Sequence, residues 1–468
     1  MPPPGAANIN PAPMAIAFGS SGVRGRLGVE ITPAVIAALA QAVGEQSQGG
    51  MVIVGADCRR GREALLEAAV AGLAQGGARI ERVERPLATP VLAHAVIRRG
   101  ASFGINLTAS HNSSEYQGFK LTGHWGGPAL PDLTDRIAAR AQALLDHPES
   151  PLTVAAQSTP LDPIPPYLEA LRRLAPAQFQ NRDLTFAPLY GVTQGIWDAL
   201  ARPLVRLHTL TSGRREDFGG APPDPVEGRL RGVDPRGVQE LWGCDGDGDR
   251  FGILSHGVWI PPDEIAALIV DAAMRGLIPP LKIEAGQAVA RSIPSRGLLD
   301  RVCRHHGLSI LETPVSFRHL AQAIAEGRAV LAVEESGGMA WSGFIPEKDG
   351  MFVLTLLLHL LAFGSLAQQV EELKERVGSV CRIGEKIPGF WEPEGASALL
   401  LELAAWGGEV VERDGVGVIL PDGTMLHARP SGTEPVVRLY GVFPGAVIDA
   451  QRWSLWRSLI ETTISPTV

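Results

Sequence analysis

Three aspartates at alternate positions form the densest group of chemically reactive side chains in the sequence. Asp245, Asp247 and Asp249 are separated by single glycines in the segment CDGDGDRFGIL, residues 244–254. Glycine lets a backbone turn tightly, so the three carboxylates can converge. Carboxylates this close repel one another, and a hard cation with oxygen ligands, magnesium or calcium, relieves that repulsion. The segment therefore predicts a divalent metal site, with a solvated acidic turn as the alternative.

Two other kinds of acidic loop fit this segment less well. A calcium-binding hand needs Gly at its sixth position and Glu at its twelfth. Counted from Asp245, these positions hold Arg250 and His256. A phosphatase with an aspartyl phosphate also has closely spaced aspartates after a strand, but here a third Asp is followed by Arg. The calcium-hand and aspartyl-phosphate loops are therefore the weaker interpretations of this segment.

A serine in the segment TASHNSSEYQGFK, residues 108–120, is the candidate nucleophile. Ser110 follows a predicted strand, with His111 beside it and Lys120 further along the same segment. A hydroxyl flanked by a base and a cation can be activated or phosphorylated. Ser, Asn and Gly are also ordinary loop residues, so on this segment alone a plain loop is the stronger interpretation.

Two further segments carry groups that bind anions or sugars. In HARPSGTEP, residues 427–435, Arg429 offers a bidentate guanidinium, and the amides of Ser431, Gly432 and Thr433 can form an anion nest. A plain turn is the alternative there.

The segment VEESGGMAWSGFIPEKDG, residues 333–350, follows a predicted buried strand. Glu334 and Ser336 can hydrogen-bond sugar hydroxyls, and Lys348 can meet a phosphate. A strand end with a solvated pair of glutamates is the alternative and would be favoured if this segment stood alone.

An alternation of helices and strands positions these segments. Helices are predicted over residues 32–48, with Thr32 as N-cap, and over 63–74 and 89–98; strands are predicted over 51–57, near Ile80 and over 102–107. This rhythm predicts a doubly wound α/β domain, in which ligands gather at the carboxyl ends of strands. Later stretches repeat it, and the last part predicts a helix over 396–406 and a hairpin turning at residues 421–423.

The predicted fold class is α/β, with three similar mixed-sheet α/β domains and a smaller C-terminal α+β domain. The expected domains are residues 1–150 with the serine loop, 151–274 with the metal-binding loop, 275–378 with the sugar-binding loop and 379–468 with the phosphate-binding loop. Pro- and Ala-rich residues 148–166 predict a linker, and residues 219–228 predict a rigid surface loop.

The composition allows several folded domains and excludes some partners. With 468 residues, 45% apolar and 20% charged, the chain has the balance of a folded multidomain protein. A formal net charge of −8 argues against general nucleic-acid binding. The four cysteines are far apart and are typical of reduced thiols in a cytoplasmic protein.

Neither a leader nor a membrane span is expected. Residues 1–15 are rich in proline and lack the basic and apolar regions of a signal peptide, so a frayed tail is predicted. The most apolar run, residues 351–363, is shorter than the ~20 residues of a spanning helix and predicts a buried core helix.

Together the four segments resemble, in order and spacing, the active-site segments of the α-D-phosphohexomutase superfamily, the phosphoglucomutases and phosphomannomutases. The resemblance extends to FGSSGVRG at residues 18–25, to the Asp57-Cys58-Arg59 triplet and to TPVSFR at residues 313–318. Chance agreement of four separate segments is improbable. The resemblance therefore covers almost the whole chain.

This resemblance implies four domains around a central cleft, each contributing one segment. It implies that Ser110 carries the phosphoryl group, next to magnesium held by Asp245, Asp247 and Asp249. The other expected site residues are Arg24 and Lys120 beside the phosphoserine, and Arg250, Arg318, Glu334, Ser336, Lys348, Arg429, Ser431, Gly432 and Thr433 around the substrate.

The sequence departs from the family pattern at four positions. Ser113 stands where many relatives have Pro, Gln117 where they often have Asn, and Arg318 where Lys is frequent. Gly338 takes the place of the His in the E-x-S-G-H form, so this loop loses a candidate for proton transfer. The resulting EESGG is similar to several phosphoglucomutases.

The expected reaction interconverts hexose 1-phosphate and hexose 6-phosphate, with glucose favoured. Phosphorylated Ser110 gives its phosphoryl group to the free hydroxyl of the sugar phosphate. The bound hexose 1,6-bisphosphate then turns around and returns its other phosphoryl group to Ser110. A trace of the bisphosphate is the expected activator. Cations around the transferring group should dominate catalysis, and His111 is the candidate general base, with a plain loop His as the alternative.

Mannose, glucosamine and pentose phosphates remain open as substrates. A phosphoserine-dependent phosphatase and a sensor without catalysis are the rival functions, and the sensor has little reason to keep Ser110, the three aspartates and Lys120. The expected partner is a small sugar phosphate, with neither nucleic acid nor membrane, for a cytoplasmic monomer or homodimer.

Overall fold

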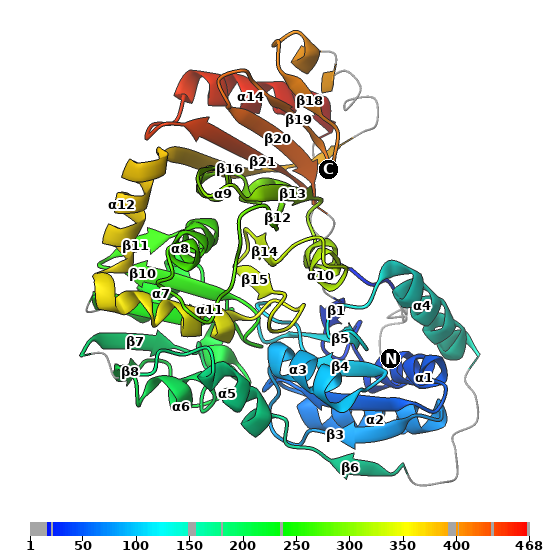
Figure 1. Ribbon diagram of the computed structural model, residues 1–468. Coiled ribbons are helices and arrows are strands. Elements are labelled where there is room, and N and C mark those ends of the chain that lie inside the picture. Colours follow the sequence, from blue (N-terminus) through cyan, green and yellow to red (C-terminus); the bar gives the residue numbers. More distant parts are fainter. Residues whose placement is uncertain are drawn as a thin grey trace, which may run out of the picture.

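The computed structural model describes residues 16–19, 22–147, 156–178, 181–234, 237–391, 399–400, 402–431 and 435–465. Among the described residues, four sheets of four to six strands follow one another along the chain, and a two-stranded sheet is added in the last unit; Figure 1 shows successive units, with the C-terminal sheet apart at the top. The predicted fold class, three mixed-sheet α/β units and a C-terminal α+β unit, is confirmed. The predicted tail at residues 1–15 and most of residues 396–401 lie outside the described residues.

The first unit is a six-stranded mixed sheet in the order β1-β5-β4-β2-β3-β6. Thr32 caps its first helix, because its Oγ1 accepts the N–H of Val35 at 3.3 Å. The strands are β1 Val23–Arg26, β2 Met51–Ala56, β3 Arg79–Arg82, β4 Phe103–Leu107, β5 Tyr116–Gly123 and β6 Ser158–Pro160; the helices are α1 Pro33–Ser47, α2 Arg62–Gln75, α3 Thr89–Arg99 and α4 Pro131–Asp146.

The second unit is a five-stranded sheet in the order β11-β10-β9-β7-β8, with β7 parallel to β8 and β9. Its elements are α5 Ile164–Arg172, β7 Asp183–Ala187, α6 Trp197–Ala201, β8 Arg206–Thr209, the 3-10 turn η1 Phe218–Gly220, α7 Glu227–Val233, β9 Glu240–Cys244, β10 Phe251–Ser255 and β11 Val258–Ile260.

The third unit is a four-stranded sheet in the order β13-β12-β14-β15. Its elements are α8 Pro262–Met274, β12 Ala288–Ser292, η2 Ile293–Ser295, α9 Leu298–His305, β13 Ser309–Thr313, α10 Phe317–Ala325, β14 Leu331–Glu334, β15 Gly338–Trp341, α11 Gly350–Leu357, η3 Leu360–Phe363 and α12 Leu366–Val377.

The fourth unit is an antiparallel sheet in the order β16-β21-β20-β19-β18, covered by α14 Ala450–Thr463. The predicted hairpin is present, with Ile419 opposite Met425 across the turn. The strands are β16 Val380–Pro388, β18 Glu409–Val411, β19 Val416–Ile419, β20 Met425–Pro430 and β21 Val436–Pro444; β17 Phe390–Trp391 pairs with β22 Ile464–Ser465.

Two contacts bear on the expected domain limits. The stretch predicted as a linker contains β6, which pairs in parallel with β3, so the first sheet extends beyond residue 150. Helix α8 packs against α9 and α12 of the third unit, although residues up to 274 were expected in the second. The limits themselves remain predictions.

The apolar cores are shared unevenly among the units. One cluster of buried side chains runs from α3 of the first unit through Tyr167, Trp197 and Trp242 of the second to α11 and α12. The fourth unit has its own cluster around Trp456 and Leu439. The first three units are therefore joined through extensive apolar packing, whereas the fourth meets them through a small buried cluster of Ile293, Met425 and Val442 and through polar contacts.

The apolar run 351–363 and the proline-rich segment 219–228 can be compared with their predictions. The run 351–363, predicted as one buried helix, forms the fully buried α11 only as far as Leu357; the separate turn η3 follows, and its last residue, Phe363, is exposed. Within the described residues no single helix is long and apolar enough to cross a membrane, and Gly350–Phe363 and Leu366–Val377 meet that test only as a pair bent by 82°. Residues 219–228, predicted as a surface loop, are mostly exposed, but Pro223 and Pro225 are buried, with Pro223 against Gly246 of the metal-binding loop and Pro225 against Gly243 and Gly252 of the flanking strands.

Candidate active site

The predicted nucleophile of the first unit touches the predicted metal loop of the second. Ser110 Oγ donates a hydrogen bond to Asp245 Oδ2 at 2.7 Å, and both side chains are fully buried. Ser110 has a φ of 53°, unusual for a residue with a side chain, and such conformations concentrate at functional sites. Gly246 allows the approach, because a Cβ there would lie 2.8 Å from the Ser110 carbonyl oxygen.

A buried arginine of the Asp57-Cys58-Arg59 triplet holds the serine loop in shape. The Arg59 guanidinium donates to the carbonyl oxygens of Ser110, Asn112 and Ser113, at 2.7 Å for Asn112 and 2.6 Å for Ser113. Its Nε pairs with Asp57 at 3.0 Å. The triplet therefore positions the predicted nucleophile, whose hydroxyl faces Asp245 of the second unit.

The three aspartates converge as their spacing predicted. One carboxylate oxygen from each of Asp245, Asp247 and Asp249 lies within 4.8 Å of the others, and all three residues are fully buried. In the described part of the chain, the Oδ1 atoms of Asp247 and Asp249 have no hydrogen-bond partner. Burial, followed by the charges of Asp249 and Asp247, raises the pKa of Asp245 well above its usual range.

These observations fit a bound divalent cation. Buried oxygens without partners are costly, and a hard cation with oxygen ligands would satisfy them. Asp245, Asp247, Asp249 and the Ser110 oxygen are the residues placed to hold it.

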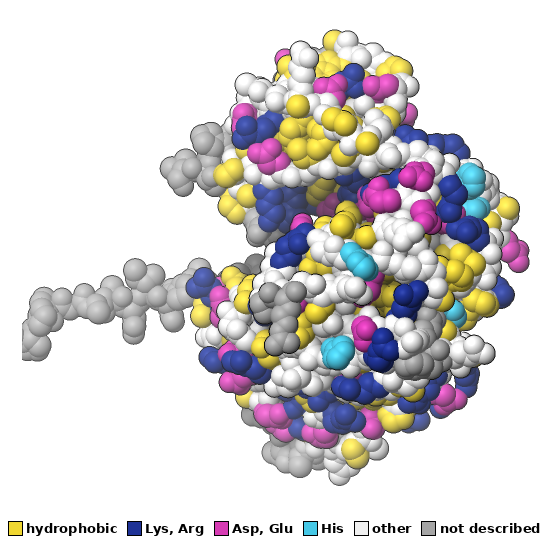
Figure 2. All heavy atoms as spheres, turned by 90° about the vertical axis from the view of Figure 1, so that its left-hand side faces the viewer, with side chains coloured by type: hydrophobic (Ala, Val, Ile, Leu, Met, Phe, Trp, Pro, Cys, Tyr) yellow, Lys and Arg dark blue, Asp and Glu magenta, His cyan; other side chains and the backbone are white. Residues whose placement is uncertain are grey.

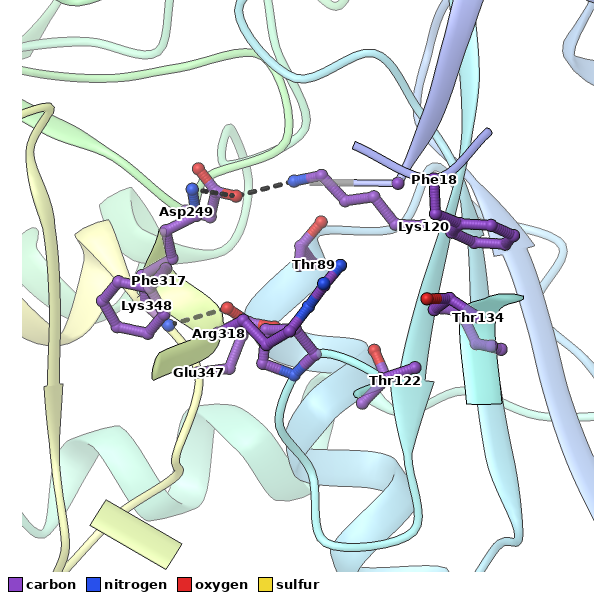
Figure 3. Close-up of a pocket in the computed structure, with 14 residues that line it drawn as sticks. Phe18, Thr89, Lys120, Thr122, Thr134, Asp249, Phe317, Arg318, Glu347 and Lys348 are labelled. Carbon is purple, nitrogen blue, oxygen red and sulfur yellow. Dashed lines mark hydrogen bonds and ion pairs between the residues drawn. The ribbon is translucent and has the colours of Figure 1, made fainter. Parts of the chain in front are cut away.

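Two lysines lie against the same carboxylates. Lys120 Nζ is 2.6 Å from an oxygen of Asp247 and 2.6 Å from an oxygen of Asp249, as Figure 3 shows for Asp249. Lys348 Nζ lies 3.5 Å from Asp249. Burial alone would raise the pKa of Asp247, yet Lys120 and a hydrogen bond from Thr89 hold it below its usual range. Lys120 and Lys348 therefore balance part of the acidic charge.

Two arginines, Arg24 of the first unit and Arg250 of the second, lie beside the serine loop. Arg24 donates to Asn112 Oδ1 at 2.7 Å, and Arg250 lies 3.6 Å from Asp224. Burial, together with the charges of Arg250 and Arg24, lowers the pKa of His111 far below its ordinary value. The imidazole is therefore neutral near pH 7, and an incoming phosphate meets several positive charges.

The predicted sugar loop approaches these arginines from the third unit. Ser336 Oγ donates to Glu334 Oε2 at 3.0 Å, and Lys348 Nζ lies 4.0 Å from the same carboxylate oxygen. A Cβ at Gly338 would lie 2.9 Å from Lys348 Cδ. The glycine that replaces the family's His therefore makes room for the stem of Lys348, which links the sugar loop to the acidic loop.

The fourth unit contributes Arg429, whose Nε lies 3.1 Å from Asp414 Oδ2. The N–H of Ser431 donates to the carbonyl of Val436 at 2.9 Å, so this amide, expected in an anion nest, is engaged in the present conformation. Gly432 and Thr433 lie outside the described residues. Figure 2 shows Lys and Arg side chains gathered in the recess below the C-terminal unit.

Arg318 lies at the junction of the first and third units and donates to the carbonyl of Gly19 at 3.1 Å. With Glu347, Lys348 and Lys120 it lines a narrow cavity of about 30 Å³ (Figure 3), which is enough for about one water molecule. The cavity is too small for a sugar phosphate. It lies against the metal-binding loop, since Asp249 and Thr89 also line it.

Sequence reasoning did not single out Thr89, Asp224 and Glu347 as site residues. Thr89 begins α3 and bonds Asp247 at 2.5 Å, while Asp224 stands between two prolines and pairs with Arg250. Glu347 precedes Lys348 and is buried. The sequence gave a signal only for Glu347, as an acidic residue next to the predicted phosphate ligand Lys348. Thr89 and Asp224 belong to the site because of contacts that form after folding.

Comparisons with known proteins agree with this geometry. Residues 15–146 match the family described as phosphoglucomutase/phosphomannomutase, alpha/beta/alpha domain I, and residues 261–379 match domain III of the same family. The chain is 26% identical over 440 residues to a phosphoglucomutase/phosphomannomutase of Thermococcus kodakarensis, covering 90% of this chain and 93% of that protein.

Two further proteins are similar over most of their length. A probable phosphoglucosamine mutase of Methanopyrus kandleri is 28% identical, with coverage of 90% of this chain and 92% of that protein. The crystal structure of a putative phosphomannomutase from Thermus thermophilus superposes with a TM-score of 0.78 at 26% identity, covering 96% of this chain and 98% of that one. With the converged segments, these matches show that the chain belongs to the α-D-phosphohexomutase superfamily, a family of phosphotransferring isomerases.

Proposed function

We propose that the protein interconverts hexose 1-phosphate and hexose 6-phosphate through a phosphorylated Ser110 and a bound hexose 1,6-bisphosphate, with glucose as the favoured sugar. The single observation that carries the proposal is the Ser110 hydroxyl 2.7 Å from a buried aspartate triplet. A structural serine would have no need of three converging carboxylates, two lysines and two arginines around it.

Each phosphoryl transfer exchanges one P–O bond for another. The bond from phosphorus to Ser110 Oγ breaks while a bond to the sugar hydroxyl oxygen forms. The proton of that hydroxyl passes to His111, whose neutral imidazole becomes a better base once the negative charge of the bound phosphates offsets the nearby Arg24 and Arg250. In the return step the same groups act in reverse. Such transfers depend on positioning and on stabilising the charge of the moving group, which Arg24 and Lys120 provide.

Magnesium is the proposed metal, held by Asp245, Asp247, Asp249 and the Ser110 oxygen. When bound, it would supply positive charge next to the transferring phosphoryl group. The chain itself supplies the buried carboxylates and the hydrogen bond that orients the Ser110 oxygen toward them.

Recognition of the sugar is assigned to the third and fourth units. Glu334 and Ser336 can hydrogen-bond the ring hydroxyls in either orientation, while Lys348, Arg318 and Arg250 attract the phosphates. Arg429, with the predicted nest at Ser431, Gly432 and Thr433, would hold the phosphate that is not being transferred. The EESGG form of the sugar loop favours glucose over mannose, glucosamine or pentose.

A side-by-side assay tests both the reaction and the substrate. The purified protein is given the 1-phosphates of glucose, mannose, glucosamine and ribose with magnesium and a trace of hexose 1,6-bisphosphate, and kcat/KM is measured for each. We expect the 6-phosphate, or 5-phosphate for the pentose, with the highest kcat/KM for glucose. A higher value for another sugar would overturn the substrate, and release of inorganic phosphate in place of isomerisation would overturn the mutase.

The cytoplasmic location, the monomeric or homodimeric state and the absence of nucleic-acid and membrane partners remain predictions. The four cysteines are free thiols, consistent with a reducing compartment.

A further inference from the structure

The C-terminal unit meets the rest of the molecule through a few defined contacts. Ile293 of the third unit packs against Met425 and Val442 of the fourth. At another point Asp414 Oδ2 accepts the N–H of Val315 at 2.9 Å. Because the fourth unit has its own apolar core, such contacts set its position over the cleft.

One of these contacts reaches the sugar-binding loop itself. Tyr440, on β21, donates its hydroxyl to Glu335 Oε1 at 3.2 Å. Glu335 directly follows Glu334, the proposed sugar ligand, and its other oxygen lies 3.7 Å from Arg382. Arg382, on β16 of the fourth unit, also pairs with the buried Asp263 of α8.

The same tyrosine is electrostatically linked to the proposed phosphate site. Burial, followed by the charge of Glu335, raises the pKa of Tyr440, while Arg429 and Arg438 act in the opposite direction. The phenol therefore stays protonated and remains a hydrogen-bond donor. Tyr440 therefore interacts both with Arg429, the proposed phosphate ligand, and with Glu335, which follows the proposed sugar ligand Glu334.

We propose that the Tyr440–Glu335 hydrogen bond fixes the position of the phosphate-binding unit relative to the sugar-binding loop. In this way it keeps the bisphosphate intermediate in the cleft between the two phosphoryl transfers. This inference rests on the proposed function. Tyr440 and Glu335 are positioning residues, since they act through Arg429 and Glu334 and not on the reacting atoms.

The contact is suited to a unit that must loosen and close again. The intermediate has to turn around while it stays bound, so the fourth unit cannot be locked as firmly as the other three. A single hydrogen bond to a carboxylate can break during the turn and re-form afterwards. Without it, the intermediate leaves the cleft more often, and the enzyme loses phosphoryl groups from Ser110.

The test compares Tyr440→Phe with wild type and with Tyr190→Phe, a control tyrosine of the second unit that stacks with Arg215. Tyr440→Phe should raise about tenfold the concentration of glucose 1,6-bisphosphate needed for half-maximal activity. It should also release more bisphosphate into solution per turnover. At saturating bisphosphate, kcat should stay within about twofold of wild type. Tyr190→Phe should change none of these values.

A double-mutant cycle shows whether the two residues act as a pair. Tyr440→Phe combined with Glu335→Ala should be no worse than the stronger single variant, because both remove the same hydrogen bond. Effects that add, or a Tyr440→Phe enzyme with an unchanged need for bisphosphate, would overturn the proposal.

A measurement without turnover separates this inference from the proposed function. Hydrogen exchange of the amides in residues 331–341 should speed up in Tyr440→Phe, although the change lies in another unit. If amide exchange in residues 331–341 is unchanged, the proposed role of the Tyr440–Glu335 contact is refuted, even if the enzyme is an active mutase. A wild-type protein inactive on every sugar phosphate refutes the function and with it the role in holding the intermediate.

Discussion

Ser110 of the first unit donates a hydrogen bond to Asp245 of the second, with 2.7 Å between Oγ and Oδ2. Two residues that are distant in the chain thus share one buried site, which no single segment could form. The contact brings the proposed nucleophile, the proposed metal ligands and several cations to the same point. The predictions below test these parts separately.

Removing one carboxylate should remove most of the metal affinity. Asp247→Asn keeps the size of the side chain but deletes a charge from the triplet, so we expect activity to fall about 100-fold and the magnesium requirement to rise. Thermal unfolding with increasing magnesium gives a readout independent of activity, and the stabilisation seen in wild type should shrink. Asp132→Asn, at the exposed start of α4, is the control and should behave as wild type. An Asp247→Asn protein stabilised by magnesium as strongly as wild type would place the metal elsewhere.

Lys120 acts as a built-in counterion for the acidic loop. It lies 2.6 Å from both Asp247 and Asp249, so Lys120→Met should destabilise the metal-free protein by about 3–5 kcal/mol, the cost of breaking a buried pair. Magnesium should restore part of the lost melting temperature. The measurement is thermal unfolding with chelator and with magnesium, and Lys282→Met, on an exposed side chain, is the control. Equal losses under both conditions would show that Lys120 does not balance the metal ligands.

Stability should fall as pH rises because of Glu347. Burial raises the pKa of this carboxyl to about 8 from an ordinary 4.5, although Lys348 and Lys120 oppose the rise. Between these values the folded chain holds the proton more tightly than the unfolded chain, so the free energy of unfolding decreases as pH increases through this window. Asp349, with a pKa raised to about 7 by burial, acts in the same direction.

Glu347→Gln should therefore flatten this dependence and melt roughly 5 °C above wild type near pH 9, with little difference near pH 5. Melting curves across this range provide the measurement. Glu409→Gln, on an exposed side chain of β18, should follow the wild-type curve. A Glu347→Gln protein that loses stability with pH as steeply as wild type would contradict the assignment.

His111 is the proposed general base, and its replacement should slow chemistry more than binding. His111→Gln is expected to lower kcat about 100-fold while KM stays close to wild type, because the side chain moves a proton and does not hold the sugar. His124→Gln, an exposed histidine of the same unit, should leave kcat unchanged. If kcat of His111→Gln stays within about threefold of wild type, another group takes the proton.

Local rules predicted much of the fold. Thr32 and Pro33 begin α1 as a cap and first turn require, and the aspartate–glycine alternation predicted a converging triplet that the structure contains. The serine segment and the segment of Glu334 were placed correctly after their strands. These features depend on neighbours in the chain, which a sequence displays directly.

Contacts between units could not be predicted in the same way. Pro223 and Asp224 read as a surface turn, since nothing in their segment shows that Gly246 and Arg250 pack against them. Tyr440 and Glu335 meet only after two sheets have folded and docked. The engagement of the Ser431 amide also depends on the return of β21 beside β20.

The phosphorylation of Ser110 is the most direct test of the whole account. Wild-type protein and Ser110→Ala are incubated with magnesium and glucose 1,6-bisphosphate, digested and analysed by mass spectrometry, and then supplied with glucose 1-phosphate. In wild type we predict one phosphoryl group on the peptide that contains Ser110. Added glucose 1-phosphate should remove this group and become the bisphosphate. In Ser110→Ala neither event should occur. Mutase activity in Ser110→Ala, or a phosphoryl group carried on a different residue, would contradict the central claim.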